Sequence, residues 1–507
     1  MPGWSSPIAS HRKESHAHAS VADGTSTIGC LARHTGDGTA TDVQARPGTA
    51  APLQTDGHNM TAKVSGRLAS LLARNSAYLP GGVSSINRII DPPIAFVKAQ
   101  GAYLWDIDGK RYIDYHAAFA PHFLGHNFAP INEAVIDVLR SCESLYGAGP
   151  TLLEGRLAEL ICTNVPAVDK VCLLNTGSEA TSLAIRLSRA ITGRKHFIVV
   201  QGSYNGNHDE LACNVFNTLA EIGPRVSPGE YPLRPNGAGT TLETSHFVHP
   251  VNFNDPESVR YVCRRYPIAA MITEPILQNI GVVRPRDGYL AALRTLADEF
   301  GFLLIFDEVK TGFRHAVGGY SEISAVRPDL VTYGKAVANG FPLALVGGKR
   351  EYMDYLVHPD PAKRPFMGGT YNGHPVAVAA ATRTIEYLLA NRSQVYQRVE
   401  ALGQQMEKGL RDIFTAHGVT ASIARQGSAF SYYLMPAAPV DFHDILEHHD
   451  FDRDVELRRA LIELGVFFVP IATKQCSISA AHTADDISLT LAQFDRAVSA
   501  VWSRRAA

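Results

Sequence analysis

Short apolar runs alternate with segments of helical periodicity between about residues 130 and 350. The runs that fit strands are residues 171–174, 197–200, 269–273, 302–306, 330–332 and 343–346. Strands that alternate with helices form a mostly parallel sheet that helices cover on both faces. This alternation therefore predicts an α/β fold for the main part of the chain.

The segments on either side of this region have other patterns. Leucines at helical spacing within residues 68–72 predict a helix, and two short runs around an Asp108-Gly109 turn predict a β-hairpin at residues 102–115. After about residue 375 the pattern indicates a smaller α+β domain. Its expected elements are a helix from Pro375, a strand at 428–434, a helix at 455–464 and a strand at 465–469.

Residues 1–59 have a different composition from the rest of the chain. They are rich in Gly, Ala, Thr, Ser and His and contain one aromatic residue, Trp4. Such a segment cannot bury enough apolar surface to fold, so we predict a disordered N-terminal extension. A transit peptide is the alternative, but five acidic residues argue against it. A further hypothesis is that the protein starts at Met60.

Charge and cysteine content exclude several classes of protein. Lys and Arg total 47 against 49 Asp and Glu, which gives no electrostatic basis for binding nucleic acid or acidic membranes. The seven cysteines are odd in number, scattered and without a C-x-x-C pair, which favours a reducing compartment. No apolar stretch reaches the roughly 18–20 residues of a spanning helix. We therefore expect a cytoplasmic protein.

A polar turn follows the strand at 171–174 and opens a helix. Its sequence is Asn175-Thr176-Gly177-Ser178-Glu179-Ala180. Free backbone N–H groups and the helix dipole favour a phosphate at such a position. The alternative is an ordinary helix cap by Thr176 or Ser178.

Two further strands end in ionisable residues. Asp307 and Glu308 follow an apolar strand, at the sheet edge where α/β proteins bind ligands. A carboxylate there suits a protonated ring nitrogen, although a loop-capping Asp is the alternative. Lys335 follows the strand at 330–332 among small and apolar residues. Desolvation would lower its pKa and allow a Schiff base, whereas a lone Lys more often extends to solvent. A phosphate cradle, a carboxylate and an amine together match pyridoxal phosphate.

More than four-fifths of the chain, from about residue 78, resembles the class III pyridoxal-phosphate aminotransferases. Within them it is most similar to the glutamate-1-semialdehyde 2,1-aminomutase branch. The matching stretches are Pro80-Gly81-Gly82-Val83, Thr176–Ala180, Gly202–Gly206, Glu274-Pro275, Asp307-Glu308-Val309, Thr311–Arg314, Gly334-Lys335, Gly369-Thr370 and Ser479–His482.

The resemblance implies the fold type I architecture with a seven-stranded-type sheet. It places the N-terminal segment of a small domain at 60–130, the large cofactor domain at 131–375 and the C-terminal part of the small domain at 376–507. It also implies a homodimer with shared active sites.

The resemblance assigns roles to individual residues. Lys335 and Asp307 are the implied catalytic residues: Lys335 holds the cofactor and moves protons on the substrate, and Asp307 keeps the pyridine nitrogen protonated. The other implied cofactor-binding residues are Gly177 and Ser178 for the phosphate, Tyr204 and Val309 on the two faces of the ring, Asn279 near the ring hydroxyl and Thr370 for the phosphate of the neighbouring subunit.

The substrate-binding residues decide between two reactions. Arg88 lines up with the family arginine that clamps a substrate carboxylate, and a surface Arg is the alternative. Three departures weaken the match to the aminomutase branch: Ser84-Ser85-Ile86, Lys310 and Lys474. We therefore predict an aminotransferase that moves an amino group between an amino acid, such as a β- or aryl-substituted one, and a keto acid. Intramolecular transfer of the aminomutase type is the alternative.

Other chemistries have weaker support. His443, Glu447, His448, His449 and Asp450 resemble metal ligands by type, but their polar surroundings favour a solvated surface helix, so we predict no metal site. No nucleotide-binding or zinc-protease motif is present. A scaffold that has lost catalysis is disfavoured because Lys335 and Asp307 are both present.

Overall fold

The computed structural model describes residues 65–241, 243 and 246–503. The predicted N-terminal extension and the hypothetical start at Met60 lie outside these residues. Within them, no helix combines the length and the apolar character needed to cross a membrane.

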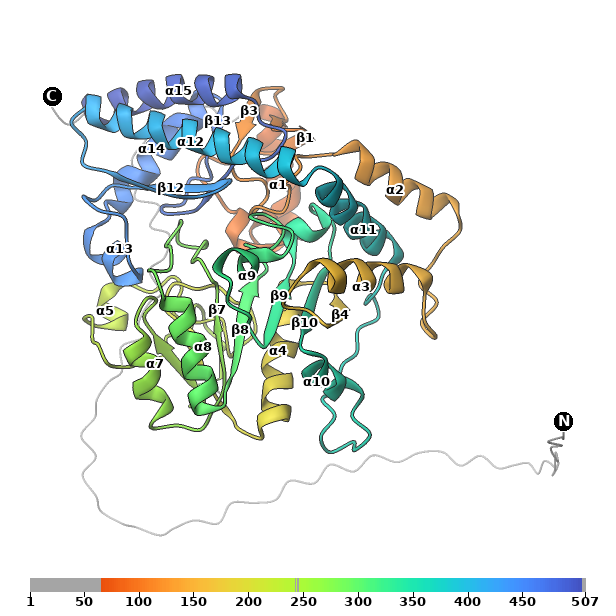
Figure 1. The fold of residues 1–507 in the computed structure, drawn as a ribbon. Helices are drawn as coiled ribbons and strands as arrows, with labels where there is room; N and C mark the ends of the chain where they lie inside the picture. Colours follow the sequence, from red (N-terminus) through yellow and green to blue (C-terminus); the bar gives the residue numbers. More distant parts are fainter. Residues whose placement is uncertain (1–64, 242, 244–245, 504–507) are drawn as a thin grey trace, which may run out of the picture. The chain divides into compact units, whose positions relative to one another are not determined.

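A seven-stranded sheet forms the centre of the large α/β region (Figure 1). Its strand order is β4-β10-β9-β8-β7-β5-β6. The strands are β4 (Lys170–Leu174), β5 (His196–Val200), β6 (Val248–Val251), β7 (Ile268–Thr273), β8 (Leu303–Glu308), β9 (Leu330–Tyr333) and β10 (Ala344–Gly348). β10 is antiparallel to both of its neighbours, and the other pairs are parallel. The predicted mostly parallel sheet is confirmed, and β6 is the one strand that the sequence pattern does not predict.

Helices cover both faces of this sheet. The helices of the region are α2 (Ala129–Arg140), α3 (Leu152–Asn164), α4 (Gly177–Thr192), α5 (Leu219–Ile222), α7 (Pro256–Cys263), α8 (Tyr289–Phe300), α9 (Gly319–Ser324), α10 (Arg350–Met353) and α11 (Pro375–Ala390), with 3-10 turns η3 (Lys335–Ala338) and η4 (Asp354–Val357). Alternate side chains of β8 point to opposite faces. Leu303 and Ile305 pack in the cluster that contains α4, and Leu304 and Phe306 pack in the cluster that contains α3, α7, α8 and α11.

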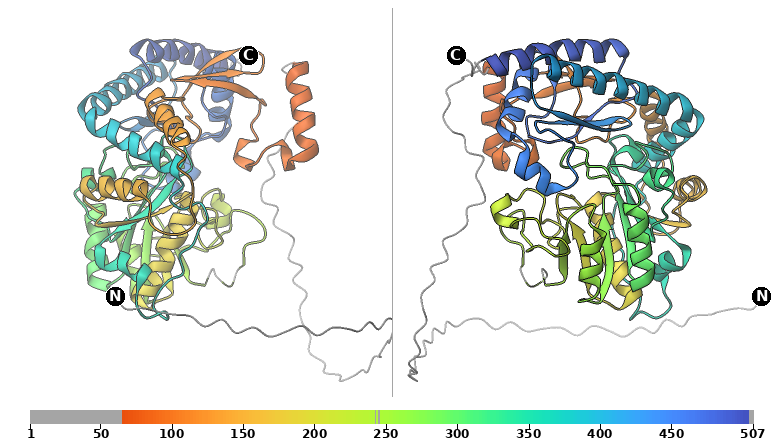
Figure 2. Two further views of the ribbon diagram at one scale, coloured as in Figure 1. Left: turned by 90° about the vertical axis from the view of Figure 1, so that its right-hand side faces the viewer. Right: turned by 60° about the vertical axis from the view of Figure 1, so that its left-hand side comes forward.

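The two ends of the described chain share a smaller region. Its strands are β1 (Phe96–Gln100), β2 (Tyr103–Asp106), β3 (Arg111–Asp114), β11 (Ser422–Gln426), β12 (Ala429–Tyr433), β13 (Val466–Phe467) and β14 (Cys476–Ser477). The predicted hairpin is formed by β2 and β3, and β13 from the C-terminal part pairs in parallel with β3. Figure 2 shows β1, β2 and β3, in orange, beside the blue C-terminal elements.

Helices complete the smaller region. They are α1 (Gly66–Tyr78), η1 (Pro80–Gly82), η2 (Ile86–Arg88), α12 (Arg392–Ala416), α13 (Phe442–His448), α14 (Phe451–Glu463) and α15 (Ala484–Ser503). The long helices α12 and α15 lie side by side (Figures 1 and 2). Aromatic residues such as Tyr115, Phe430 and Phe494 form a core beneath them.

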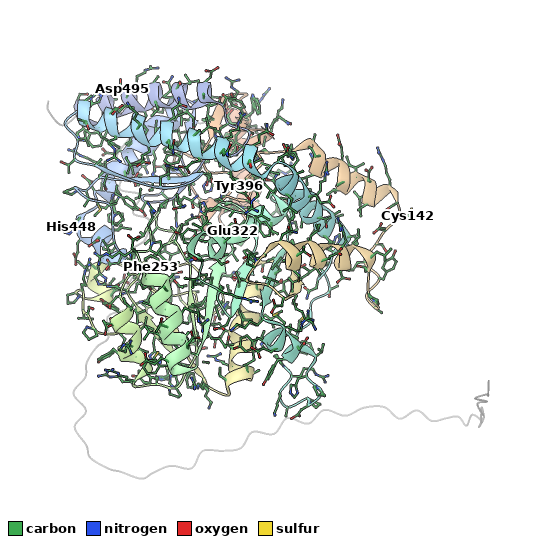
Figure 3. The ribbon with its side chains drawn as sticks, viewed as in Figure 1. Cys142, Phe253, Glu322, Tyr396, His448 and Asp495 are labelled. Carbon is green, nitrogen blue, oxygen red and sulfur yellow. The ribbon has the colours of Figure 1, made fainter. Side chains whose placement is uncertain are left out.

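Helix α12 also fixes the turn that follows β8. The hydroxyl of Tyr396 donates a hydrogen bond of 2.8 Å to the carbonyl of Phe313, and Arg392 forms an ion pair with Glu322 of α9 (Tyr396 and Glu322 in Figure 3). These contacts hold the segment that connects the end of β8 to α9.

Candidate active site

A cavity of about 280 Å³ lies where β4, β8 and β9 end. Its lining includes six residues predicted from the sequence: Gly177, Ser178, Tyr204, Asp307, Val309 and Lys335. They come together because the carboxyl ends of neighbouring parallel strands meet at one edge of the sheet. Asn175, Asn205 and Gly206 also line the cavity.

The N-terminus of α4 forms one wall of the cavity. Thr176 is the N-cap, and its hydroxyl accepts a hydrogen bond from the Glu179 N–H while the Glu179 carboxylate accepts from the Thr176 N–H. Thr176 is thus a helix cap, as the alternative proposed, and it leaves Gly177 and Ser178 in the first turn. The N–H groups of a first turn have no partner within the helix, which suits an anion.

Gly177 is required by the close approach of Val309. A Cβ built on Gly177 would lie 2.9 Å from Val309 Cγ1 and 3.1 Å from Cγ2. Both distances are below ordinary van der Waals contact, so only glycine lets the helix begin against the residue that follows β8. Because Gly177 has no side chain, its backbone faces the cavity directly.

Asp307 is held by three hydrogen bonds. Its carboxylate accepts from Asn205 Nδ2 at 2.8 Å, Thr332 Oγ1 at 2.9 Å and Val309 N at 3.0 Å. Burial raises the pKa of this carboxyl group, while its hydrogen bonds and the charge of Lys335 oppose that shift. A cation placed in the cavity would favour the ionised form further.

Glu308 is also buried but serves a different purpose. Its carboxylate accepts hydrogen bonds from the Ser321 N–H and hydroxyl at 3.2 Å and from Thr311 Oγ1 at 3.0 Å, and also from the Tyr320 N–H. Burial raises its pKa to about 7. Glu308 therefore fixes the turn that leads into α9 and does not line the cavity.

Lys335 begins η3 with a left-handed backbone, φ 47°. Such a conformation is strained for a residue with a side chain and is found at functional sites. Burial lowers the pKa of its ammonium group, and the nearby acids Asp307 and Glu274 oppose that shift. At a given pH this lysine therefore presents more neutral amine than an exposed one, as nucleophilic attack requires.

Glu274 and Asn279 form a layer next to the cavity. The buried Glu274 carboxylate accepts hydrogen bonds of 3.0 Å from Tyr204 N, Gln278 N and Asn279 Nδ2, and one of 3.3 Å from Ser203 Oγ. It thus orients Asn279, which the sequence assigns to the cofactor but which does not itself line the cavity. No role for Glu274 was predicted, although it directly follows β7 just as Asn175 follows β4.

Two predicted residues lie away from the cavity in the single chain. Thr370 is exposed and lines a separate hollow with Tyr146, Thr151 and Asn372. Arg88 is exposed on η2 and does not line the cavity. The roles of Thr370 toward a second subunit and of Arg88 toward a carboxylate stay predictions.

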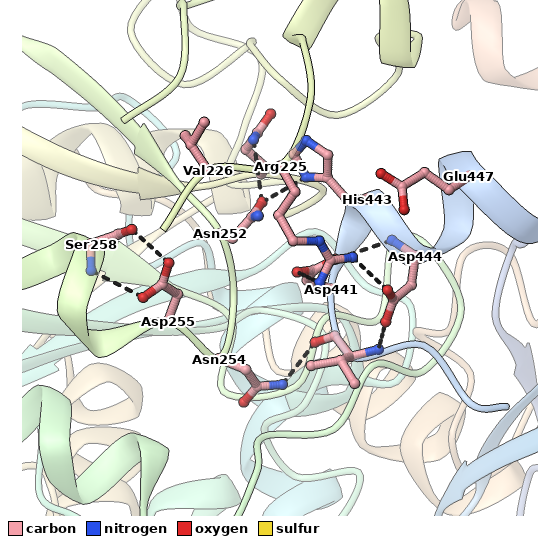
Figure 4. Close-up of polar contacts among 12 residues, drawn as sticks. Arg225, Val226, Asn252, Asn254, Asp255, Ser258, Asp441, His443, Asp444 and Glu447 are labelled. Carbon is pink, nitrogen blue, oxygen red and sulfur yellow. Dashed lines mark hydrogen bonds and ion pairs between the residues drawn. The ribbon is translucent and has the colours of Figure 1, made fainter. Parts of the chain in front are cut away.

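Of the candidate metal ligands near α13, Glu447 and His448 are exposed and lie close to Asp444, whereas His443 and His449 are buried. His443 is buried rather than solvated: its Nδ1 lies 3.1 Å from Asn252 Oδ1 and its Nε2 lies 3.1 Å from the Gly223 carbonyl oxygen. Asp444 forms an ion pair with Arg225. Figure 4 shows the contacts of His443 with Asn252 and of Asp444 with Arg225. The solvated face predicted for this segment is thus wrong at His443 and His449 and right at the exposed Glu447 and His448.

The residues of the cavity fit pyridoxal phosphate. A helix N-terminus with no Cβ at Gly177 suits a phosphate, the buried Asp307 suits a ring cation, and Lys335 supplies an amine. Tyr204 and Val309 line the same cavity and offer flat and apolar surfaces to a ring.

Comparison with known proteins agrees with this geometry. Residues 86–498 match the family model for class III aminotransferases. A glutamate-1-semialdehyde 2,1-aminomutase of Syntrophomonas wolfei is 34% identical over 438 residues, which cover 85% of this chain and 97% of that protein. An omega-transaminase from Sphaerobacter thermophilus superposes with a TM-score of 0.78 at 28% identity, covering 85% of this chain and 97% of the other.

A β-phenylalanine aminotransferase from Variovorax paradoxus has a TM-score of 0.73 at 26% identity, over 86% of this chain and 94% of that one. The fold type I architecture is shared with these structures. This chain belongs to the class III aminotransferase family, whose cofactor is pyridoxal phosphate.

Proposed function

We propose that this chain transfers an amino group on a small amino-acid substrate, with Lys335 as the reactive amine. The observation that carries this proposal is the convergence of Lys335, Asp307 and the N-terminus of α4 on one cavity. An amine, a carboxylate and a phosphate cradle at these positions support amino-group chemistry with pyridoxal phosphate.

When bound, the cofactor supplies an electron-accepting ring that stabilises a substrate carbon after it loses a proton. Lys335 would bind the cofactor and then take up and return the proton at that carbon. Asp307 would hold a proton on the ring nitrogen, since its own orientation is fixed by Asn205, Thr332 and the Val309 N–H.

Other residues would position the cofactor. Gly177 and Ser178 would bind the phosphate through the first turn of α4, and Tyr204 and Val309 would enclose the ring. Asn279, oriented by Glu274, would approach the ring hydroxyl. In a homodimer, Thr370 would reach the phosphate of the partner, and its exposed position leaves it free for that contact.

The relatives favour intramolecular transfer of the glutamate-1-semialdehyde 2,1-aminomutase type. Those with that name are 34–35% identical to this chain over 83–85% of its length. They support this alternative better than the intermolecular transfer that the sequence predicts. We therefore put the aminomutase reaction first among the finer assignments.

A specific observation keeps intermolecular transfer as the second candidate. Lys310 and Lys474 stand where the aminomutase branch has other residues, and both ammonium groups lie close to Asn279. Two cations in this place disfavour a substrate intermediate with two amino groups and suit an acidic or keto substrate. The solved transaminases of this fold are consistent with that reaction.

One experiment separates the two candidates. Purified protein loaded with pyridoxal phosphate is incubated with 4-amino-5-oxopentanoate alone, and in parallel with a panel of α- and β-amino acids plus a keto acid. Formation of the 5-amino-4-oxo isomer without a second substrate would support the aminomutase. Release of a keto acid from one donor, with bleaching of the yellow cofactor, would support the aminotransferase. A protein that takes up no cofactor would refute both.

A further inference from the structure

Lys474 carries a positive charge that has no acidic partner. It lies between β13 and β14, and its Nζ donates a hydrogen bond of 3.0 Å to the carbonyl oxygen of Asn279. The same Nζ lies 4.8 Å from the centre of the Phe216 ring. Among the described residues, no carboxylate lies within ion-pair distance of it. A largely buried ammonium with only a carbonyl and a ring as partners is incompletely compensated.

A second lysine side chain contacts the same segment. Lys310 is buried, and its Nζ donates to the Gln278 carbonyl oxygen at 2.6 Å and lies 3.5 Å from Asn279 Oδ1. The ammonium groups of Lys310 and Lys474 therefore both contact the segment Gln278–Asn279. Burial lowers the pKa of Lys310 well below its usual value, the charges of Lys335 and Lys474 add to that shift, and Glu274 opposes it.

The nearby acids are already occupied. Glu274 accepts hydrogen bonds from Ser203, Gln278, Asn279 and the Tyr204 N–H. Asp307 is bound on the cavity side, where the ring nitrogen of the cofactor would lie. Neither acid neutralises Lys474 directly, although Glu274 acts on it from a distance. A ligand that bears a negative charge could therefore pair with Lys474.

The segment that carries Lys474 is rigidly held. Asp454 and Arg458 of α14 form a fully buried ion pair with an Oδ1–Nε distance of 2.6 Å. Arg458 donates to the carbonyl oxygens of Val469 and Lys474, and Asp454 accepts from the Thr473 N–H. The backbone of Lys474 is thus fixed on one side while its side chain reaches Asn279 on the other. Such support is typical of groups that must be positioned before a ligand arrives.

We propose that Lys474 is the residue that binds the carboxylate of the substrate, so that the enzyme selects amino compounds bearing an anionic group over neutral amines of the same skeleton. This inference rests on the proposed function and names its substrate class. It assigns to Lys474 the role that the sequence assigned to Arg88. Neither residue lines the cavity, but Arg88 is exposed, whereas Lys474 is largely buried and bonded to Asn279. Glu274 joins Asn279 to Tyr204, which does line the cavity.

The ionisation of Lys474 is consistent with this role. Burial lowers its pKa to about 8, with Glu274 opposing and Arg458 adding to that shift. The group therefore remains mostly protonated at neutral pH, as a carboxylate partner requires. An anion bound beside it would replace the missing charge and raise its pKa.

The test measures binding of inert carboxylates to the protein loaded with pyridoxal phosphate. Glutarate and 3-phenylpropanoate have no amine and cannot react, so calorimetric titration reports the subsite without turnover. The variants are Lys474→Met, Lys474→Arg as the conservative replacement, and Lys408→Met of the exposed face of α12 as the matched control. Arg88→Met tests the alternative residue for the carboxylate. Cofactor absorbance and melting temperature are recorded for each variant, and Lys474→Gln replaces Lys474→Met if the latter unfolds.

We expect Lys474→Met to weaken binding of at least one probe by about tenfold or more, and Lys474→Arg to stay within about threefold of wild type. Lys408→Met should bind as wild type does. Equal affinity of Lys474→Met and wild type would overturn the proposal, as would a loss confined to Arg88→Met. The absence of saturable binding of both probes to the wild type would also overturn it. Failure of Lys335 to bind the cofactor would instead refute the proposed function, and cofactor absorbance distinguishes the two failures.

Discussion

Gly177→Ala tests how closely α4 approaches the end of β8. The new Cβ would lie 2.9 Å from Val309 Cγ1, so either the helix or the valine must shift. Overpacking of this kind costs about 1–3 kcal/mol. Alanine is favoured over glycine in a helix by up to about 1 kcal/mol, which offsets part of that cost. We expect the free energy of unfolding to fall by about 1–2 kcal/mol.

The measurement is urea unfolding of the protein without cofactor, so that loss of phosphate binding does not enter the result. Gly155→Ala in α3 is the matched control, because a Cβ there meets nothing within 4 Å. That variant should be slightly more stable than wild type. Titration with pyridoxal phosphate then gives the separate effect of Gly177→Ala on cofactor affinity, which we expect to fall.

A second substitution identifies the cause. Val309→Ala removes both methyl groups that the new Cβ would strike, so the double variant Gly177→Ala/Val309→Ala should regain most of the stability lost through the clash. The two single effects should therefore be non-additive by about 1 kcal/mol or more. Strict additivity would refute the contact argument, and so would a destabilisation of Gly155→Ala equal to that of Gly177→Ala.

Four further predictions concern Lys335, the two acids of β8 and the ion pair of α14. Lys335→Ala should abolish turnover and leave the cofactor non-covalently bound; a cofactor adduct on the intact variant after borohydride reduction, detected by mass spectrometry, would contradict this. Asp307→Asn should lower kcat/KM by about 10²–10³-fold with little change in stability, and a rate within twofold of wild type would refute it. Glu308→Gln should leave kcat/KM nearly unchanged and alter the stability of the protein. Because burial raises the pKa of Glu308 to about 7, the folded protein binds more protons than the unfolded chain between about pH 4.5 and 7, and stability falls by about 3 kcal/mol as pH rises through that window. The variant should lose this slope in urea unfolding at several pH values, and an unchanged slope would exclude Glu308 as its source. Asp454→Asn should cost about 3–5 kcal/mol, since it leaves the buried Arg458 without its counter-charge, and a loss below about 1 kcal/mol in urea unfolding would refute that.

The sheet was largely predictable because its strands are continuous apolar runs of the right length. Each of the six predicted strands is present close to its expected ends. β6 was not predicted because its four residues include His249 and Pro250, and proline normally argues against a strand. β6 lies at the edge of the sheet and pairs only with β5, so Pro250 can be accommodated there.

The site was predictable where it depends on strand ends and less so where it depends on tertiary contacts. Asp307 lies at the end of β8, and Gly177 and Lys335 come shortly after β4 and β9. The strand ends meet at one edge of the sheet, which brings the three residues together. The buried Asp454–Arg458 pair could not be recognised, because an acid and an arginine four residues apart on a helix normally form an exposed pair. Its burial is decided by β12, whose Tyr432 ring centre lies 5.3 Å from the guanidinium carbon of Arg458, and by α15, which packs against α14.

The two acids at the end of β8 show how the geometry selects one of two equivalent-looking residues. Successive side chains of a strand point to opposite faces, so Asp307 shares a face with Leu303 and Ile305, and Glu308 shares the other with Phe306. The first face packs against α4, whose N-terminus forms the phosphate wall of the cavity. The partners on β9 agree: Asp307 is paired with Thr332, which donates to it, and Glu308 with Tyr333, which is buried in the opposite core. Only Asp307 can therefore meet a ligand anchored at the start of α4, whereas Glu308 is available to hold the turn behind it.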